Sequence, residues 1–287
     1  MTDAATMTEA EAGRVAGTLA EIACAAGTVL RRWHGGDCPH VLKVDGSPSS
    51  TADIEAEALI LEALAARFPG IPIVAEESGY DRGAGDLFFL VDPLDGTRDF
   101  LAGTPHYSVN IALVAQGRPI AAALAAPGHD RVWLSAAEAF EAPIRDGRPG
   151  PAHPVHSRRA PEAGLLALGS RRHGDLETAA CLASLPVLEV RTSGSALKFG
   201  LLASGEADIY IRCGATMEWD TAAGDAILTA AGGCVVVPGG GPIRYGRVAD
   251  GFRNGPFAAL GDPALAADVT LIPGATCGMP RAAPAAR

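Results

Sequence analysis

Hydrophobic residues recur with helical spacing at the beginning of the chain. Thr8-Glu9-Ala10-Glu11 is a capping-box pattern, in which the threonine and the second glutamate satisfy each other's backbone N–H groups. Apolar residues then follow at intervals typical of one helix face: Val15, Leu19, Ile22, Ala26, Val29 and Trp33. A second helix is predicted over 51–67, with an apolar side formed by Ile54, Leu61, Leu64 and Phe68.

Short apolar runs after this helix predict strands. The runs 71–75 and 87–91 are almost continuously apolar, and 109–114 alternates as a half-buried strand does. The runs 120–126 and 131–136 come next along the chain. Because short connections join these later runs, we expect an antiparallel meander.

The composition changes over residues 141–163, where Pro, Gly, Arg and His crowd together. We place the boundary between two halves there, because strands and helices alternate afterwards, as in an α/β unit behind an α+β unit. The later strands are predicted at 165–168, 187–190, 207–211 and 235–237, and the helices near 174–183, 195–203 and 219–231. The expected units are 8–145 and 160–271, with flexible ends at 1–7 and 272–287.

Two carboxylates stand at the end of the predicted strand 87–91. Asp92 and Asp95 flank Pro93, which restricts φ, and Gly96, which permits a tight turn, comes next. Taken alone, this pattern fits an Asx turn about as well as a functional site. The two hard oxygen ligands can also share divalent cations, and the N–H groups of a helical turn beginning here would attract phosphate.

More acidic residues stand at the ends of other predicted elements. Glu76 and Glu77 end one predicted strand, and Asp220 begins one predicted helix. Individually, the glutamates would be interpreted as surface charge and Asp220 as a helix cap. Because no cluster of His or Cys competes, the combination with the first pair of carboxylates favours an oxygen-ligand metal site over zinc.

The formal net charge of −10 argues against broad binding of nucleic acid. An anionic substrate would then need a local reversal of the field, which bound divalent metal would provide. The six cysteines are scattered without a CxxC pair, which favours reduced thiols in a cytoplasmic protein. No apolar run is long enough to span a membrane and the N-terminus lacks a secretory pattern, so we expect no integral membrane segment. A peripheral association with the inner membrane stays open.

Three motifs occur in a characteristic order: Ala75-Glu76-Glu77-Ser78, Asp92-Pro93-Leu94-Asp95-Gly96-Thr97 and Trp219-Asp220-Thr221-Ala222-Ala223-Gly224. Together they resemble the inositol-monophosphatase-like superfamily of metal-dependent, lithium-sensitive phosphatases, over residues 14–262. The resemblance implies a layered α/β/α/β/α sandwich of the sugar-phosphatase or inositol monophosphatase type, with the site between the two halves.

Within that superfamily the chain is most similar to CysQ-type 3'(2'),5'-bisphosphate nucleotidases. Arg98-Asp99-Phe100 stands where these members carry a basic–acidic–Phe triplet, whereas inositol monophosphatases usually carry Asn-Phe nearby. The segments 43–48 and 194–199 resemble the KxDGSP and GSSLKF segments of the nucleotidases, and Ser50 stands where threonine is more usual. The resemblance implies hydrolysis of 3'-phosphoadenosine 5'-phosphate to AMP and phosphate, which recycles this nucleotide in sulfur assimilation.

The resemblance also implies roles for single residues. Two or three Mg²⁺ ions would be held by the side chains of Glu76, Asp92, Asp95 and Asp220 and by the backbone carbonyl of Leu94. Glu76 would orient the attacking water, and the Thr97 hydroxyl, polarised by Asp53, would accept its proton. The expected substrate contacts are Glu76, Leu94, Asp95, Gly96, Thr97 and Asp220 at the phosphate and His173, Ser195, Lys198 and Arg212 at the nucleotide.

Several alternatives stay open at this point. On a predicted helix Lys198 can face one site with Ser195, but Lys198 and Arg212 also fit ordinary surface charges, and His173 fits a plain loop residue. An inositol monophosphatase or another small sugar-phosphate phosphatase would use the same metals. A catalytically silent binding protein on this fold would have lost a metal carboxylate, and none is lost here. The expected partner is a small-molecule nucleotide, with the chain a monomer or a homodimer.

Overall fold

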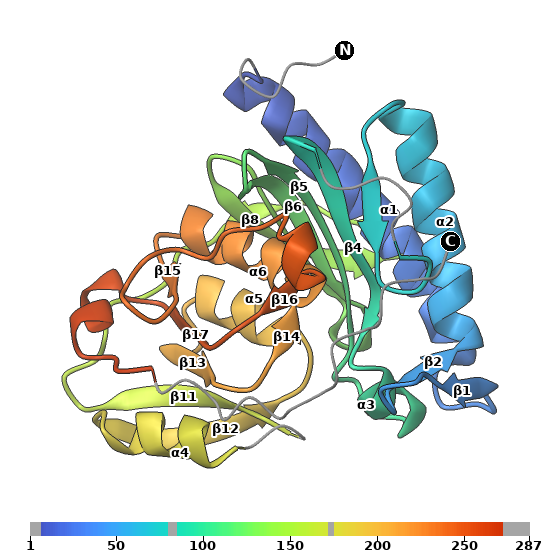
Figure 1. Ribbon diagram of the computed structural model, residues 1–287. Coiled ribbons are helices and arrows are strands. Elements are labelled where there is room, and N and C mark those ends of the chain that lie inside the picture. The colour runs from blue at the N-terminus through green and yellow to red at the C-terminus, as the bar shows by residue number, and fades with distance from the viewer. Residues whose placement is uncertain (1–6, 80–84, 172–174, 272–287) are drawn as a thin grey trace.

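The computed structural model describes residues 7–79, 85–171 and 175–271, whose elements stack as alternating layers of helices and sheets (Figure 1). Two helices cover one face of a large sheet, two more lie between it and a smaller sheet, and one helix closes the far side. In the order of the layers, the helices are α1 (Glu9–Trp33) with α2 (Thr51–Arg67), α5 (Leu197–Ala203) with α6 (Glu218–Ala230), and α4 (Leu176–Ala183). The predicted α/β/α/β/α sandwich is therefore confirmed.

Two sheets form the β layers of the stack. The larger sheet runs in the order β10 (His153–Pro154), β8 (Ala139–Arg145), β7 (Arg131–Ser135), β6 (Arg118–Ala126), β5 (Ser108–Ala115), β4 (Leu87–Asp95) and β3 (Ile73–Ala75), with β9 (Arg148–Pro149) paired to β8. The smaller sheet runs β12 (Val187–Ser193), β11 (Leu165–Ser170), β13 (Ile209–Arg212), β17 (Phe257–Leu260) and β15 (Cys234–Val236). In the larger sheet only the edge pair β3–β4 is parallel among the described strands.

Three short elements lie beside these sheets. They are the hairpin of β1 (His40–Leu42) and β2 (Pro48–Ser50), the helical turn α3 (Thr97–Leu101), and the pair of β14 (Thr216–Met217) with β16 (Arg253–Asn254). Of these, α3 follows β4 directly and β14 leads directly into α6, so both stand next to motifs that the sequence singled out.

The first two helices each begin at a capping box, of which the sequence predicted the first. Thr8 and Glu11 form the expected capping box, and at α2 Ser50 and Asp53 form a second one. Each such cap is worth about 1 kcal/mol to its helix, because it satisfies N–H groups that the first turn leaves without partners. None of the described helices is both long and apolar enough to cross a bilayer.

Strand β4 carries the core on both of its faces. Phe89 and Val91 point toward α1 and α2, whereas Phe88 and Leu90 point toward α5 and α6. All four are at most 1% exposed, as the two-residue side-chain period of a strand requires when helices cover both sides. The strand that delivers the carboxylates is thus rigidly held along its length.

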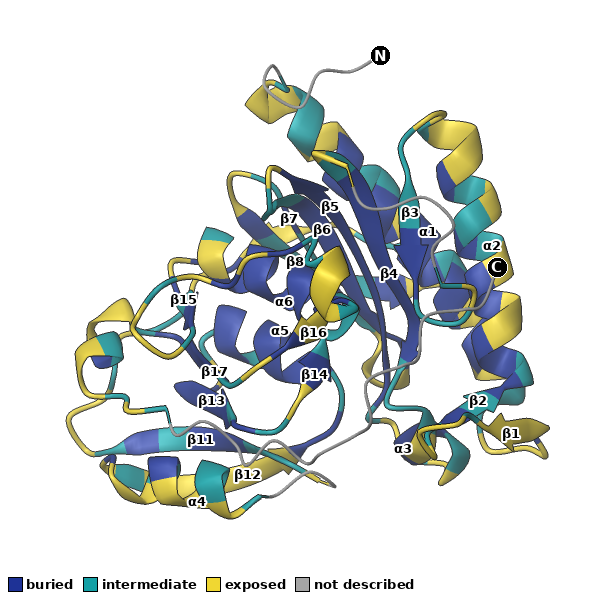
Figure 2. Ribbon diagram, in the orientation of Figure 1, coloured by how far each residue is buried: buried dark blue, intermediate teal, exposed yellow. Residues whose placement is uncertain are grey.

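The alternating pattern correctly predicted a strand at 109–114, but the prediction that one face of this strand is exposed was wrong. Every residue of β5 is buried, and Figure 2 shows β5 dark along its length. The second face is covered by α6, which lies far away in the sequence and packs on β4, β5 and β6. The polar positions on that face are Ser108 and Asn110, both at most 1% exposed.

The apolar side predicted for α2 was also partly wrong. Ile54 is 52% exposed, and the buried side of the helix instead carries Asp53 and Glu57 together with Ala56 and Ile60. The two acidic residues lie one turn apart, so they share a face. That face is buried because it looks toward the strand ends, which places two carboxylates inside the molecule.

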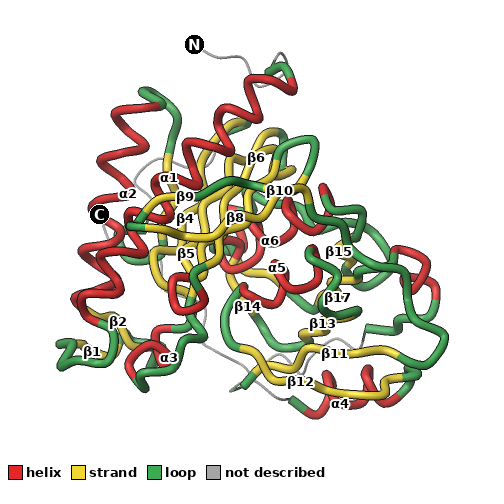
Figure 3. Tube along the Cα trace, turned by 180° about the vertical axis from the view of Figure 1, so that it is seen from behind, coloured by secondary structure: helices red, strands yellow, loops and turns green. Residues whose placement is uncertain are grey.

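The larger sheet continues past residue 145. β8 pairs with β9 and β10, so the sheet extends to Pro154 within the stretch where we expected a boundary. Figure 3 shows β8, β9 and β10 beside β5 and β6 rather than beside β11 and β12. In addition, α5 and α6 share one core cluster with strands of both sheets. The division into units 8–145 and 160–271 stays a prediction, and residues 1–6 and 272–287 lie outside the described part.

Candidate active site

The carboxylate motif forms an irregular end of β4. Pairing between β4 and β5 shifts register between Asp92 and Asp95, so the two side chains leave the strand at a bulge. Asp92 is 1% exposed, and its Oδ1 accepts the N–H of Leu94 at 3.0 Å. Burial raises the pKa of Asp92 well above its ordinary value, and Glu76, Asp95 and Asp220 add to the shift. All four acidic residues therefore lie within one electrostatic site.

Gly96 turns the chain from β4 into α3. Its φ of +92° lies in the left-handed region, and a Cβ there would stand 2.8 Å from the backbone oxygen of His106. Only glycine meets both conditions without strain. The neighbouring Asp95 accepts a short hydrogen bond from the N–H of Ala196, which ties the turn to the segment before α5.

Thr97 and Asp53 form the hydroxyl–carboxylate pair that the resemblance implied. The Thr97 hydroxyl lies 3.1 Å from Oδ1 of Asp53 and 3.1 Å from the backbone oxygen of Leu94. The other oxygen of Asp53 accepts from the N–H and hydroxyl of Ser50, at 2.8 and 2.5 Å. Burial raises the pKa of Asp53 to about 6. The serine at position 50 thus holds the carboxylate with one oxygen turned to Thr97.

Glu76 emerges at the end of β3 beside a lysine from the hairpin. The Lys43 ammonium lies 2.8 Å from Oε1 of Glu76 and 2.7 Å from Oε1 of Glu77. Burial raises the pKa of Glu76 to about 7 despite this cation. The loop itself is held by Glu57, whose carboxylate accepts the N–H groups of Glu77 and Ser78 at 2.9 and 2.7 Å.

Sequence reasoning assigned no role to Lys43 or Glu57. Glu57 had a usable signal, since it follows Asp53 by one helical turn and must share its face. Lys43 had only its place in the segment 43–48, because no spacing rule connects position 43 with Glu76 and Glu77, which only the tertiary structure brings beside it.

Asp220 reaches the site from the first turn of α6. Its Oδ2 accepts the N–H of Met217 at 3.0 Å, so it closes the helix end from the third position rather than acting as the N-cap residue. Burial raises the pKa of Asp220 to about 8, and Asp95 and Glu76 contribute by repulsion. The Asp220 carboxylate therefore caps the start of α6 and also lies close to the other carboxylates of the cluster.

The donor set fits a hard divalent cation. Four carboxylates converge, and the Leu94 carbonyl joins them at the bulge, which are the oxygen ligands that Mg²⁺ prefers. Within the described residues, no three His, Cys, Asp or Glu side chains stand in ready metal-binding geometry. Each carboxylate also accepts a hydrogen bond from a nearby N–H or from Lys43.

Repulsion among these carboxylates predicts an unusual dependence of stability on pH. Because the pKa values of Glu76 and Asp220 are raised to about 7 and about 8, the folded state binds protons more tightly than the unfolded chain. In EDTA, the free energy of unfolding should therefore fall as pH rises from about 4 to about 8, and saturating Mg²⁺ should largely remove the fall. Thermal unfolding at several pH values, with and without Mg²⁺, checks this expectation. In EDTA, Asp220→Asn should reduce the fall of the free energy of unfolding with rising pH. A profile that rises with pH in EDTA contradicts it.

Ser195 and Lys198 do not share a helix face as predicted. Ser195 precedes α5 and has a φ of +53°, and the helix begins only at Leu197. Lys198 is 2% exposed, and its ammonium donates to the backbone oxygens of Ser193 and Ser195 at 3.3 and 2.6 Å. Burial lowers its pKa to about 8, and the ammonium lies 4.7 Å from the centre of the Tyr210 ring. The surface-charge alternative for Lys198 is thus excluded.

Arg212 ends β13, as predicted, and is partly buried. Its Nη2 donates to the backbone oxygen of Ala215 at 3.0 Å. It also acts electrostatically on Asp95 and Asp220, so it stands beside the carboxylate cluster rather than on a remote surface. His173, the remaining predicted nucleotide contact, lies outside the described residues.

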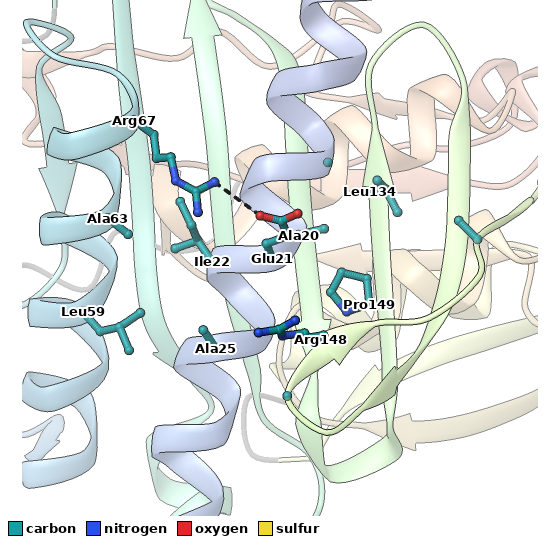
Figure 4. A pocket seen from close by; sticks show the side chains of 13 residues that line it. Ala20, Glu21, Ile22, Ala25, Leu59, Ala63, Arg67, Leu134, Arg148 and Pro149 are labelled. Atoms are coloured by element: carbon teal, nitrogen blue, oxygen red, sulfur yellow. Dashed lines mark hydrogen bonds and ion pairs between the residues drawn. The ribbon is translucent and has the colours of Figure 1, made fainter.

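A separate hollow of about 650 Å³ lies on the helix side of the larger sheet (Figure 4). Glu21 of α1 and Arg67 of α2 form an ion pair of 3.3 Å at it, and small residues such as Ala25 and Ala63 line it. None of its lining residues is a predicted site residue. The candidate site is therefore the carboxylate cluster at the end of β4.

Comparison of the sequence with known families identifies the family to which the chain belongs. The family model described as the inositol monophosphatase family matches residues 11–263, so the chain belongs to this family. Among the curated relatives, the 3'(2'),5'-bisphosphate nucleotidase CysQ of Escherichia coli strain K12 is 35% identical over 240 residues, which cover 78% of this chain and 91% of the relative. The corresponding protein of Buchnera aphidicola is 36% identical over 206 residues, 71% of this chain and 76% of the relative.

Solved structures of members of this family have the same fold as this chain. CysQ from Bacteroides thetaiotaomicron, a bacterial member of the inositol monophosphatase family, superposes with a TM-score of 0.73 at 30% identity. The match covers 86% of this chain and 97% of that protein. An inositol monophosphatase from Anabaena reaches a TM-score of 0.70 at 26% identity, covering 91% and 98%.

Proposed function

We propose that the protein is a Mg²⁺-dependent phosphomonoesterase that converts 3'-phosphoadenosine 5'-phosphate to AMP and phosphate. The observation that carries the proposal is the convergence of the buried Asp92 and the partly buried Glu76, Asp95 and Asp220 beside the Thr97–Asp53 pair. The substrate follows from the likeness to CysQ nucleotidases. Recycling of this nucleotide in a reducing cytoplasm belongs to the same proposal, and it is supported by five described cysteines that are all free.

The carboxylates and the Leu94 carbonyl would hold two or three Mg²⁺ ions. Such ions neutralise phosphoryl oxygens and lower the pKa of bound water. Glu76 orients the attacking water, and the Thr97 hydroxyl takes a proton from this water while it passes its own proton to the Asp53 carboxylate. The water oxygen bonds to phosphorus as the bond from phosphorus to the ribose oxygen breaks, and the ribose oxygen takes a proton from solvent water. With a pKa of about 6, Asp53 is ionised at neutral pH and can play this part. Gly96 permits the turn that brings Thr97 to the cluster, because a Cβ there would clash with the backbone oxygen of His106.

A substrate panel at one Mg²⁺ concentration tests the proposal. We expect kcat/KM for 3'-phosphoadenosine 5'-phosphate to exceed that for inositol 1-phosphate at least about tenfold. A preference for inositol 1-phosphate would favour the alternative, an inositol monophosphatase or another small sugar-phosphate phosphatase. Phosphate release from neither substrate would favour a silent binding protein instead.

The two cations predicted from the sequence should behave differently from one another. Arg212→Ala should raise KM for the bisphosphate about tenfold and affect a simple monophosphate much less, because a charge-assisted contact with the second phosphate is lost. Lys198→Ala should lower kcat/KM on both substrates, since its ammonium holds the backbone at Ser193 and Ser195 beside Asp95. Steady-state kinetics on both substrates checks this. Equal losses in Arg212→Ala would make that residue structural.

A further inference from the structure

Arg171 follows directly on β11 and is anchored by a buried carboxylate. Its Nε lies 3.7 Å from Oδ1 of Asp99, in an ion pair whose two side chains are 37% and 6% exposed. The Asp99 carboxylate is inside the protein, whereas the Arg171 side chain is partly open to solvent. An arginine held in this way keeps donors for a ligand and loses little conformational entropy on binding.

The anchor belongs to the wall of the candidate site. Asp99 stands in α3, two residues after Thr97. A Cβ added to Gly194 would lie 2.7 Å from Oδ2 of Asp99, so the segment before α5 packs directly on this carboxylate. Within the same segment, Ala196 donates its N–H to Asp95. Asp99 and Asp95 thus both contact the segment that precedes α5, one at Gly194 and the other at Ala196.

Arg171 and Lys198 share electrostatic surroundings. Burial lowers the pKa of His106, and the charges of Arg171 and Lys198 lower it further. Lys198 is committed to two backbone oxygens and is 2% exposed, so it has little freedom to reach a substrate. Arg171, by contrast, combines a site position with solvent access.

The proposed substrate poses a charge problem that the carboxylate cluster does not solve. Metal ions at the cluster would serve the phosphate being cleaved, and the second phosphate needs cations of its own, of which Arg212 is one. The net charge of −10 means that these cations must be local. The planar guanidinium suits a phosphate better than an ammonium does, because it can donate two parallel hydrogen bonds.

We propose that Arg171, positioned by Asp99, binds the phosphate that is not cleaved and so selects bisphosphates over simple monophosphates. This inference rests on the proposed function, and it makes Arg171 and Asp99 the pair that determines the specificity for bisphosphates. It also accounts for the acidic residue of the Arg98-Asp99-Phe100 triplet, which serves as the anchor of the arginine.

The test compares kcat/KM for 3'-phosphoadenosine 5'-phosphate with that for adenosine 3'-monophosphate, which lacks only the second phosphate. Arg171→Met should lower the ratio of the two values at least about tenfold, mainly through KM for the bisphosphate, and Arg171→Lys should lower it less. The matched control is Arg191→Met, which removes an exposed arginine paired with Glu189 on the neighbouring β12 and should leave the ratio unchanged.

Asp99→Asn tests the positioning role separately. It should lower the same ratio, and it should add little in an Arg171→Met background, because both substitutions remove one interaction. If Arg171→Met lowers both kcat/KM values equally, or leaves the ratio of a bisphosphate-preferring wild type intact, the inference alone is overturned. If the wild type shows no preference for the bisphosphate, the proposed substrate falls, and the inference falls with it.

Discussion

Replacing Asp95 by asparagine should lower kcat at least about a hundredfold while the fold remains intact. The amide oxygen can still accept the N–H of Ala196, so the tie between the β4 turn and the segment before α5 survives. What disappears is one negative charge of the four that converge at the bulge. Phosphate release measured over a range of Mg²⁺ concentrations gives kcat, and thermal unfolding reports the fold.

The matched control for this experiment is Asp86→Asn. Asp86 is exposed and stands just before β4, so the same chemical change is made at the opposite end of the same strand. It should leave kcat and the Mg²⁺ dependence as in the wild type. If Asp95→Asn instead shows near-normal turnover with unchanged Mg²⁺ dependence, the metal assignment of the carboxylate cluster is wrong.

Replacing Thr97 by valine should lower kcat about a hundredfold or more, because proton transfer by a positioned group contributes on this scale. Valine keeps the shape of the side chain and removes the hydroxyl that lies 3.1 Å from Oδ1 of Asp53. Thr97→Ser keeps the hydroxyl and should lose far less. Comparing the two variants in the same assay separates the chemistry of the hydroxyl from its packing.

Asp53→Asn extends this experiment to the partner of Thr97. Its kcat should fall in the same direction, and the double variant with Thr97→Val should show much less than the product of the two effects, since both remove one unit. Asp53 also holds Ser50 at the start of α2, so some loss of stability should accompany the change. Equal activities of Thr97→Val and Thr97→Ser would exclude a catalytic role for the hydroxyl.

Much of the local structure follows from short-range chemistry that can be read in the sequence. The capping residues Thr8 and Ser50 begin α1 and α2, and the apolar run of β4 ends at the carboxylates Asp92 and Asp95. These features depend on hydrogen bonds and side-chain periods that act over three or four residues. The motif order also indicated the family, to which the chain belongs.

Other features of the site depend on contacts between distant segments. The alternation in 109–114 indicated an exposed face, but α6 covers it, and Ile54 gives way to Asp53 and Glu57 on the buried side of α2. A hydrophobic pattern reports which faces can be buried, whereas the packing of remote elements decides which faces are buried. The site lies where these remote elements meet.

The sequence by itself determined the types of chemistry present: oxygen ligands at the ends of elements, a hydroxyl beside them, and cations further along the chain. Only the tertiary structure decided which charges face one another. It buried Lys198, set Lys43 against Glu76, and joined Arg171 to Asp99. The physical reason is that burial and Coulomb interactions depend on distance in space, and partners dozens of residues apart leave no periodic signal in the chain.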